Sequence, residues 1–504
     1  MVFNSYTFVA FFVIMLVLHN LPIPWKAKKI NLLIASYVFY AAWNPPFILL
    51  LWLSTVVDFF VGRALYTQPN KNKRRLLLVI SLIGNLGMLC FFKYGGFILE
   101  NFVHITNALG FDYHPAKPNI ILPAGISFYT FTTLCYTIDM YKKKNKPVGS
   151  LLDFSLFVTF FPHLVAGPIV RPPQLVPQFE NEHKATRQQL LDGLMLLSLG
   201  LFMKVVCADT LLAGTSDMVF GAGRPIAPLD AWAGVLAFSG QIFFDFAGYS
   251  TSAIGVAMCL GFILPQNFLY PYAAIGFSDF WRRWHITLSS WLRDYLYIPL
   301  GGNRQGRFRT YVNVMITMLI GGLWHGASWT FVAWGGLHGV YLWAEKALKD
   351  SRAKTSGAAG DGGVPVPVDD GGDPAPVIAT ASLGPDLTTK RPAGFLYALL
   401  TFLLICITWV FFRSATFGGA ALMLLSMFGR IPPAGPPVLA TATIIKVGIV
   451  IALMLAFHWS MRNTTVLKTA GKMPWWLVGI VWSVLLILII LSQETSKAFI
   501  YFQF

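Results

Sequence analysis

The chain has 504 residues, of which 56% are hydrophobic and 12% are charged, and its net charge is +16 at pH 7. Soluble proteins average about 45–50% apolar and about 25% charged residues, so this composition excludes a soluble enzyme. The basic residues lie in short loops between apolar runs. This pattern indicates membrane topology and contact with anionic lipid, with no nucleic-acid partner.

Apolar windows of about 20 residues recur along most of the chain and predict membrane-spanning helices. They fall at 5–21, 30–43, 46–66, 75–93, 120–140, 151–167, 189–208, 231–262, 309–324, 328–346, 394–412, 441–460 and 475–492. Some of these windows are short enough to be re-entrant. Two further segments, 96–110 and 417–429, are expected to lie in the membrane interface. The sequence therefore predicts an all-α polytopic membrane protein.

The loops alternate between basic and neutral in the first half of the chain, as the positive-inside rule requires. Basic residues follow the first apolar run, and others lie at 63, 71–75 and 142–146. The loops at 44–46 and 94–119 carry few charges. This alternation predicts an N-terminus outside the cytoplasm. The first run has no basic residue before it, so it is expected to be a retained helix. A basic loop at 462–472 is predicted to be cytoplasmic, which sends the C-terminal tail outside.

Composition changes abruptly to Gly, Pro, Ala and Asp between residues 350 and 392. Such a segment cannot bury a core, so it is predicted to be a disordered cytoplasmic linker. It divides a main membrane body, 1–349, from a group of C-terminal helices with an aromatic tail, 393–504. The five cysteines lie in apolar stretches without a CxxC pair or a histidine at ligand spacing, and no metal site is predicted.

His325 is the most conspicuous ionisable residue, because it lies in a glycine-flanked apolar stretch between two predicted spans. An ionisable group at membrane depth is a functional hypothesis, although a hydrogen-bonded structural histidine is equally compatible with the pattern. His338 is interpreted as structural. His285 follows the aromatic and basic run Phe277–Trp284, in a segment expected to form an amphipathic interfacial helix with an aromatic belt.

Arginines at the ends of this region are suited to an anionic phosphate at the cytoplasmic surface, and a plain positive-inside loop would look similar. They are Arg282, Arg283, Arg304, Arg307 and Arg309. Four other charges fall inside apolar runs. Asp245 is expected to pair with a histidine or arginine or to cap a broken helix, Asp58 to face a polar partner in the bundle, and Asp139 and Lys204 to pair or snorkel.

Several segments are similar to the membrane-bound O-acyltransferase family, in the branch of the alginate O-acetylation and teichoic-acid D-alanylation membrane proteins. They are Pro123–Tyr129, Phe161–Ile169, Asp245–Tyr249, the stretch 280–302 and Trp324-His325-Gly326. The resemblance implies that His325 is catalytic, that His285 supports it, and that Asp245 and Trp324 belong to the same site. It also implies a ring of tilted helices around a thinned central funnel, with re-entrant or interfacial helices.

The resemblance further implies a function. The protein is expected to move acetyl groups from cytoplasmic acetyl-CoA across the bacterial inner membrane for O-acetylation of an exported, alginate-like polysaccharide. No bound cofactor is expected, and the partner would be a periplasmic acetyltransferase. Tyr501, in the aromatic tail, is the candidate acyl relay. D-alanyl transfer from a carrier protein to teichoic acid and a non-enzymatic polysaccharide transporter are the alternatives, and the absence of visible repeats disfavours the transporter.

Overall fold

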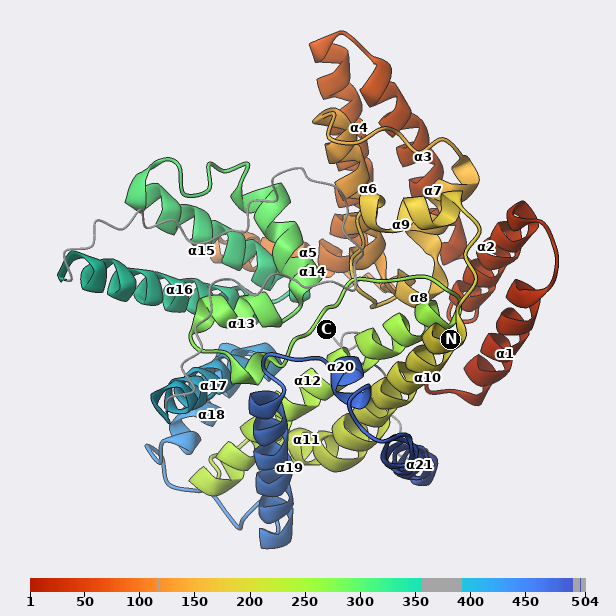
Figure 1. Ribbon diagram of the computed structural model, residues 1–504. Coiled ribbons are helices and arrows are strands. Elements are labelled where there is room, and N and C mark those ends of the chain that lie inside the picture. Colours follow the sequence, from red (N-terminus) through yellow and green to blue (C-terminus); the bar gives the residue numbers. More distant parts are fainter. Residues whose placement is uncertain (117, 356–391, 493–498, 500–504) are drawn as a thin grey trace. The chain divides into compact units, whose positions relative to one another are not determined.

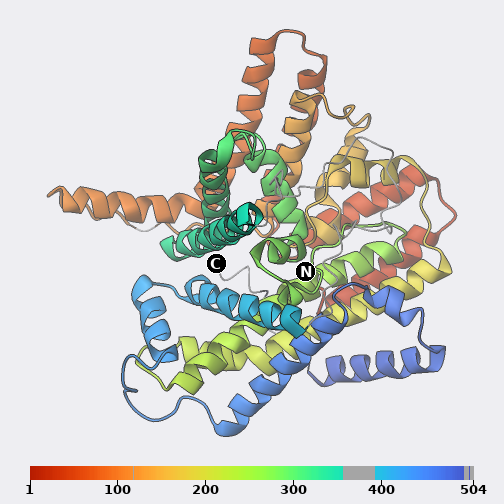
Figure 2. The same cartoon turned by 60° about the vertical axis from the view of Figure 1, so that its left-hand side comes forward.

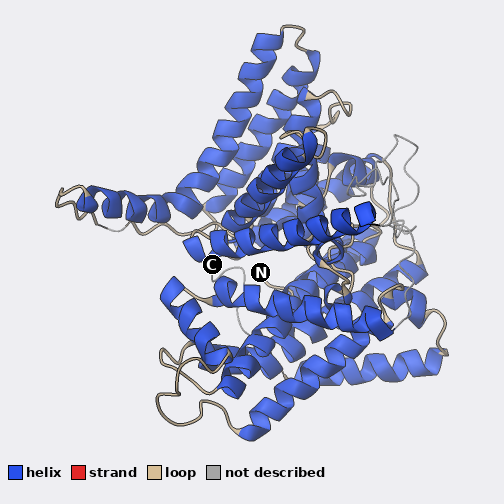
Figure 3. Ribbon diagram, turned by 90° about the vertical axis from the view of Figure 1, so that its left-hand side faces the viewer, coloured by secondary structure: helices blue, strands red, loops and turns tan. Residues whose placement is uncertain are grey.

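The computed structural model describes residues 1–116, 118–355, 392–492 and 499. The described residues form helices and connecting loops, with no strand among them (Figure 3). This confirms the all-α prediction. Residues 356–391 of the predicted linker and Tyr501 lie outside the described residues, so the division of the chain at 350 and 392 stays a prediction.

The described residues of the first half of the chain contain eleven α-helices (Figure 1). They are α1 (Tyr6–Asn20), α2 (Trp25–Ala41), α3 (Phe47–Thr67), α4 (Lys71–Leu89), α5 (Gly95–Ala108), α6 (Ile126–Tyr141), α7 (Leu151–Thr159), α8 (Phe161–Leu164), α9 (Pro172–Glu180), α10 (Arg187–Leu201) and α11 (Gly214–Phe220). Two π-helical stretches, Cys90–Tyr94 and Phe202–Ala213, continue α4 and α10.

Ten further α-helices follow in the described part of the second half. They are α12 (Pro228–Cys259), α13 (Phe277–Arg283), α14 (Ile286–Leu292), α15 (Gly306–His325), α16 (Trp329–Thr355), α17 (Pro392–Arg413), α18 (Phe417–Met427), α19 (Thr441–Ser460), α20 (Val466–Ala470) and α21 (Trp475–Leu491). A 3-10 turn, Pro271–Ala273, precedes α13, and a π-helical stretch, Arg293–Tyr297, follows α14.

Six helical segments are long and apolar enough to cross a membrane, within the residues that the structure describes. They are Phe47–Thr67, Lys71–Ala108, Arg187–Phe220, Pro228–Cys259, Gly394–Arg413 and Thr441–Ser460. The protein is therefore a multi-pass membrane protein. The predicted run 151–167 is not one span: Phe160 has an extended backbone between the short helices α7 and α8.

The helices group into two compact units. Among the described residues, unit 1 consists of 1–116, 118–202, 248–265, 489–492 and 499, and unit 2 consists of 203–247, 266–355 and 392–488. In unit 1, α3, α4 and α6 lie side by side, and α5 runs away from α3 and α4 (Figures 1 and 2). A buried polar cluster joins the first three of these helices. Asp58 of α3 accepts hydrogen bonds from Ser81 and Asn85 of α4 at 2.6 and 2.8 Å, and Asn85 accepts one from Thr133 of α6 at 3.0 Å.

Unit 2 is organised around the antiparallel pair α15 and α16, which lie side by side (Figure 1). Glycines make this close packing possible. A Cβ atom on Gly322 of α15 would overlap the Phe331 carbonyl of α16, and one on Gly335 of α16 would overlap the Met318 carbonyl of α15. Small residues at such contacts allow helix backbones in membranes to approach each other. The pair therefore fixes the end of α15, where His325 lies.

Candidate functional site

His325 is the last residue of α15 and is 3% exposed. Gly326 ends the helix with an extended backbone. A Cβ atom at Gly326 would overlap the Phe331 ring, so glycine is required at this position for the close approach of α16. The sequence Trp324-His325-Gly326 therefore presents the histidine at a sharp helix end against the neighbouring helix.

Aromatic rings enclose the His325 imidazole. Its centroid lies 4.9 Å from that of Trp324, 5.0 Å from that of Trp334 and 5.5 Å from that of Phe412. These three side chains are between 1% and 4% exposed. We call His325, Trp324, Trp334, Phe412 and His285 the histidine chamber. Its apolar walls keep water away from the imidazole, which strengthens electrostatic interactions within the chamber.

His285 lies between α13 and α14, with a left-handed backbone (φ 43°) that non-glycine residues rarely adopt. This turn breaks the segment into two short helices, so the prediction of one amphipathic helix here is wrong. Main-chain hydrogen bonds hold the break: Ile286 N donates to Asn267 O, and Leu269 N donates to Arg283 O, each at 2.9 Å. The strained conformation aims a fully buried imidazole into the chamber.

Asn267 fixes the tautomer of His285. Its Oδ1 atom lies 3.1 Å from His285 Nδ1 and also accepts hydrogen bonds from Thr287 N at 3.3 Å and Thr287 Oγ1 at 2.9 Å. Because the backbone N–H can only donate, this atom is an acceptor, and His285 Nδ1 must carry the proton. In the neutral imidazole the lone pair is therefore on Nε2.

The two histidines meet in the chamber, 40 residues apart in sequence. Their ring centroids lie 6.4 Å apart, and the Trp324 ring contacts both, at 4.9 Å from His325 and 5.8 Å from His285. Two imidazoles at this separation can both reach one small substrate group. The structure thus brings together the two histidines and the tryptophan that the sequence singled out.

Asp245 supports this arrangement from α12. It is 2% exposed and pairs with Lys204, whose Nζ atom lies 2.7 Å from Asp245 Oδ1 and 3.0 Å from Asp209 Oδ1. Its partner is thus a lysine, whereas the sequence suggested a histidine or arginine. The next residue, Phe246, packs edge-on against His285 with centroids 4.6 Å apart. The ion pair therefore anchors the part of α12 that forms the wall behind His285.

The two arginines of α13 differ sharply in burial and in their contacts. Arg283 is 6% exposed, donates to Asp279 at 3.0 Å and to the carbonyls of Leu269 and Arg462, and so holds the chain in place. Burial alone would raise the pKa of Asp279, but Arg283 and Arg462 hold it below its ordinary value. Arg282, in contrast, has a side chain that is 48% exposed and lies 3.9 Å from Asp279.

Arg304, Arg307 and Arg309 are exposed at the start of α15, at the opposite end of this helix from His325. Arg307 lies 3.8 Å from Asp350, a weak contact for an exposed pair. Together with Arg282 they are the arginines that remain available to a phosphate. Within the described residues, no three histidine, cysteine, aspartate or glutamate side chains gather in a way that could hold a metal ion.

Other residues of the site were missed by sequence reasoning or placed outside it. Asn267, Trp334 and Phe412 were missed, although a polar asparagine inside the apolar run 262–270 was a signal. His338 lies beside the chamber, 4.7 Å from Trp334 between ring centroids, and bonds Thr408 at 3.1 Å. Since the Thr408 hydroxyl donates to Ile405 O, it accepts from His338, which gives this histidine a structural contact.

We expect Asn267→Leu to lower the turnover number at least tenfold, because a rotated His285 no longer matches the substrate geometry. The leucine also leaves buried donors on His285 and Thr287 unpaired, at a cost of about 1–3 kcal/mol in stability. Asn313→Leu is the matched control. Asn313 is buried on α15 and donates to Gly302 O at 2.9 Å, but it lies twelve residues before His325. Equal losses of activity in folded samples of both variants would contradict a positioning role.

The sequence is similar to those of known proteins. Residues 142–357 match the sequence profile of the MBOAT, membrane-bound O-acyltransferase family, and this range includes both histidines. A probable alginate O-acetylase of Azotobacter vinelandii is 38% identical over 430 residues, which cover 85% of this chain and 78% of the relative. One from Pseudomonas aeruginosa is 39% identical over 404 residues, covering 80% and 70%.

Proteins named for other activities are also similar to this chain. A peptidoglycan O-acetyltransferase of Helicobacter pylori is 37% identical over 428 residues, covering 80% of this chain and 74% of the relative. A teichoic acid D-alanyltransferase of Streptococcus thermophilus is 33% identical over 244 residues, covering only 43% and 55%. The buried histidine pair lies within the family profile, and the relatives align along most of the chain. This protein belongs to the membrane-bound O-acyltransferase family and is an O-acyltransferase.

Proposed function

We propose that this protein transfers acetyl groups from cytoplasmic acetyl-CoA, across the bacterial inner membrane, toward an exported polysaccharide. The observation that carries this proposal is the meeting of His325 and His285 in a buried aromatic chamber, with ring centroids 6.4 Å apart. The relatives named as alginate O-acetylases support acetyl as the acyl group, since they cover much more of the chain than the D-alanyltransferase does.

In this proposal His325 acts as general base. It takes the proton from an acceptor hydroxyl as the oxygen attacks the thioester carbonyl of the donor. The tetrahedral intermediate then collapses, the carbon–sulfur bond breaks, and the proton passes from the imidazolium to the departing thiolate. His285, whose lone pair is on Nε2, orients the hydroxyl or His325. No covalent intermediate on serine or cysteine is needed.

The donor enters from the cytoplasmic side in this proposal. The start of α15 carries Arg304, Arg307 and Arg309, and the positive-inside rule assigns this end to the cytoplasm. His325, at the other end of α15, then lies toward the periplasmic side. The alternation of basic and neutral loops supports a periplasmic N-terminus and a periplasmic C-terminal tail, and in this proposal the tail meets a periplasmic acetyltransferase there.

Tyr501 is the proposed first acceptor. From Ser492 to Phe504 the tail has 13 residues (504 − 492 + 1), and it can extend at most ~45 Å, enough to reach into the membrane. The phenol of a tyrosine, with a pKa of about 10, is a better leaving group than a sugar hydroxyl. An acetyl-tyrosine ester would therefore pass its acetyl group to a sugar in a downhill step.

The proposal is tested with protein purified in detergent and supplied with [14C]acetyl-CoA. We expect release of free thiol and a labelled protein, with the label absent from Tyr501→Phe and thiol release reduced to slow hydrolysis. A protein that ignores acetyl-CoA but releases D-alanine from a loaded carrier protein would replace the proposal by the D-alanyl alternative. Undiminished labelling of Tyr501→Phe would contradict the relay role of Tyr501 and leave the rest of the proposal unchanged.

The exposed arginines give a separate prediction. The variant with Arg282, Arg304, Arg307 and Arg309 all changed to glutamine should raise the Michaelis constant for acetyl-CoA about tenfold, because each exposed contact contributes about 0.2–1 kcal/mol. The maximal rate should change little, since phosphate contacts far from the reacting carbon are equal in the ground and transition states.

The matched control changes three other exposed basic residues, Lys71, Lys73 and Arg75 of α4, to glutamine. This variant loses a similar amount of positive charge, and its Michaelis constant should stay at the wild-type value. If the arginine variant keeps that value as well, these residues serve membrane topology only.

A further inference from the structure

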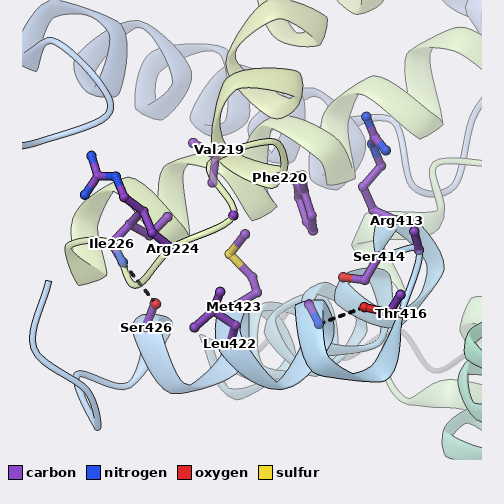
Figure 4. A pocket seen from close by; sticks show the side chains of 13 residues that line it. Val219, Phe220, Arg224, Ile226, Arg413, Ser414, Thr416, Leu422, Met423 and Ser426 are labelled. Carbon is purple, nitrogen blue, oxygen red and sulfur yellow. Dashed lines mark hydrogen bonds between the residues drawn. The ribbon is translucent and has the colours of Figure 1, made fainter. Parts of the chain in front are cut away.

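A cavity of about 240 Å³ opens in unit 2, between the end of α11 and the turn that joins α17 to α18. Figure 4 shows that its lining comes from two directions. Val219 and Phe220 come from α11, and Arg413, Ser414 and Thr416 come from the opposite side together with α18. Its volume is just below the ~300 Å³ at which small-molecule sites begin, so it admits one ring-sized group.

Polar groups line one part of the cavity. Ser414 is only 8% exposed, and its hydroxyl is directed into the cavity (Figure 4). The Thr416 oxygen accepts the N–H of Gly419 at 3.1 Å and keeps its own proton for donation. Arg413 donates to Asp217 at 3.0 Å and lies over the Phe220 ring, 5.8 Å from its centroid. This part of the cavity therefore offers both hydrogen-bond donors and hydrogen-bond acceptors.

This mixture favours hydroxyl groups as the ligand. Arg413 is already neutralised by Asp217, but Arg224, the other arginine in the lining, donates only to the carbonyls of Ala434 and Pro436 at 2.6 and 2.7 Å, so the lining keeps one positive charge that suits the carboxylate of a uronate sugar. A sugar hydroxyl both donates and accepts, which matches an ion pair flanked by serine and threonine hydroxyls. The C–H face of a sugar ring is apolar and suits the apolar part of the lining, which includes Val219, Phe220, Leu422 and Met423.

The cavity adjoins the histidine chamber through α17. The Phe412 ring packs against His325 with centroids 5.5 Å apart, and the next residue, Arg413, lines the cavity. A chain of aromatic contacts also links the cavity to the chamber. The ring centroids of Phe220 and Phe238 lie 5.8 Å apart, and those of Phe238 and Phe412 lie 6.3 Å apart. In the orientation proposed above, this end of α17 is the periplasmic one.

We propose that this cavity binds one sugar residue of the polysaccharide and holds the strand beside the periplasmic end of the histidine chamber. The inference rests on the proposed function, because it needs an exported glycan on that side. It adds a glycan subsite to an acetyl exporter. The strand would then be close to the point at which acetyl groups leave the protein.

The test uses the full chain in detergent, with oligomannuronate and chitooligosaccharide as probes and saturation-transfer NMR as readout. We expect wild-type protein to bind oligomannuronate more tightly than chitooligosaccharide, because only the first carries carboxylates that Arg224 can contact, and we expect 0.5 M salt to weaken this preference. Met423→Trp fills the cavity and should weaken binding at least tenfold, and Ser414→Ala should weaken it about threefold. Leu425→Trp is the matched control, because Leu425 is on the same helix but 42% exposed.

Thiol release from acetyl-CoA is measured in parallel on the wild-type protein. Release without binding of either oligosaccharide overturns the glycan subsite and leaves the proposed function standing. Absence of release contradicts the proposed function instead. Displacement of the sugar by phosphatidylglycerol, or binding that Met423→Trp and Ser414→Ala leave unchanged, assigns the cavity to lipid or to no ligand and also overturns the inference.

Discussion

His325→Ala should lower the rate of acetyl transfer by about 10²- to 10⁴-fold, the usual contribution of a positioned general base. The imidazole is the group in the histidine chamber that contacts Trp324, Trp334 and Phe412 together. Alanine removes the base and leaves these rings in place. The measurement is thiol release from acetyl-CoA by purified protein, with the acceptor tail present.

The loss of activity must be separated from a loss of folding, because alanine also leaves a cavity among the three rings. His325→Gln keeps most of the volume and should be equally inactive. His114→Ala is the matched control: the His114 side chain is 70% exposed beside Asp112, and its removal should change neither rate nor stability. Wild-type turnover by a folded His325→Gln variant would exclude His325 as the base.

His285→Ala should lower the rate less than His325→Ala does, since His285 orients and does not accept the proton in the proposed mechanism. A loss as large as that of His325→Ala would instead assign His285 a direct part in the proton transfer. Asn267→Leu should resemble His285→Ala, because it disturbs the same imidazole through its hydrogen bond at 3.1 Å.

Lys204→Met should destabilise unit 2 by about 3–5 kcal/mol, the usual cost of removing one partner from a buried ion pair. Lys204 is 6% exposed and neutralises two carboxylates, Asp209 and Asp245, which are 5% and 2% exposed. Methionine fills similar space but leaves two buried negative charges. Thermal unfolding in detergent should show a clearly lowered midpoint.

Two further variants decide whether charge is the cause. Changing Asp209 and Asp245 to asparagine in the Lys204→Met background removes the uncompensated charges and should recover much of the stability. Lys349→Met breaks a pair with Glu345 in which the lysine side chain is 65% exposed and the glutamate side chain 13% exposed. Because the lysine lies largely in solvent, its loss should cost less than about 1 kcal/mol. Equal midpoint shifts in Lys204→Met and Lys349→Met would contradict the buried-charge explanation.

The sequence alone predicted most helices well. The runs at 46–66, 394–412 and 441–460 correspond to α3, α17 and α19 within two residues at each end. This succeeds because the length and apolar content of a spanning helix are local properties of the chain. His325 was likewise conspicuous, since an ionisable residue in an apolar run can be seen without any knowledge of its neighbours.

The predicted amphipathic helix over 277–297 failed for the opposite reason. Its residues interleave at helical spacing, but the chain turns at His285 because Asn267 and Leu269 offer main-chain partners to Ile286 and Arg283. These partners come from a segment that precedes the turn by about 15 residues. A periodic pattern cannot show such a contact, since it describes only one face of one element.

Composition and patterning by themselves determined that this protein is a polytopic helical membrane protein, and the resemblance of its motifs indicated an acyltransferase. The tertiary structure decided what surrounds each functional residue: the aromatic walls of His325, the tautomer of His285 and the pairing of Asp245 with Lys204. Those contacts join residues that are 9, 18 and 41 positions apart. Packing between helices selects them, and no local spacing in the chain encodes which partners will meet.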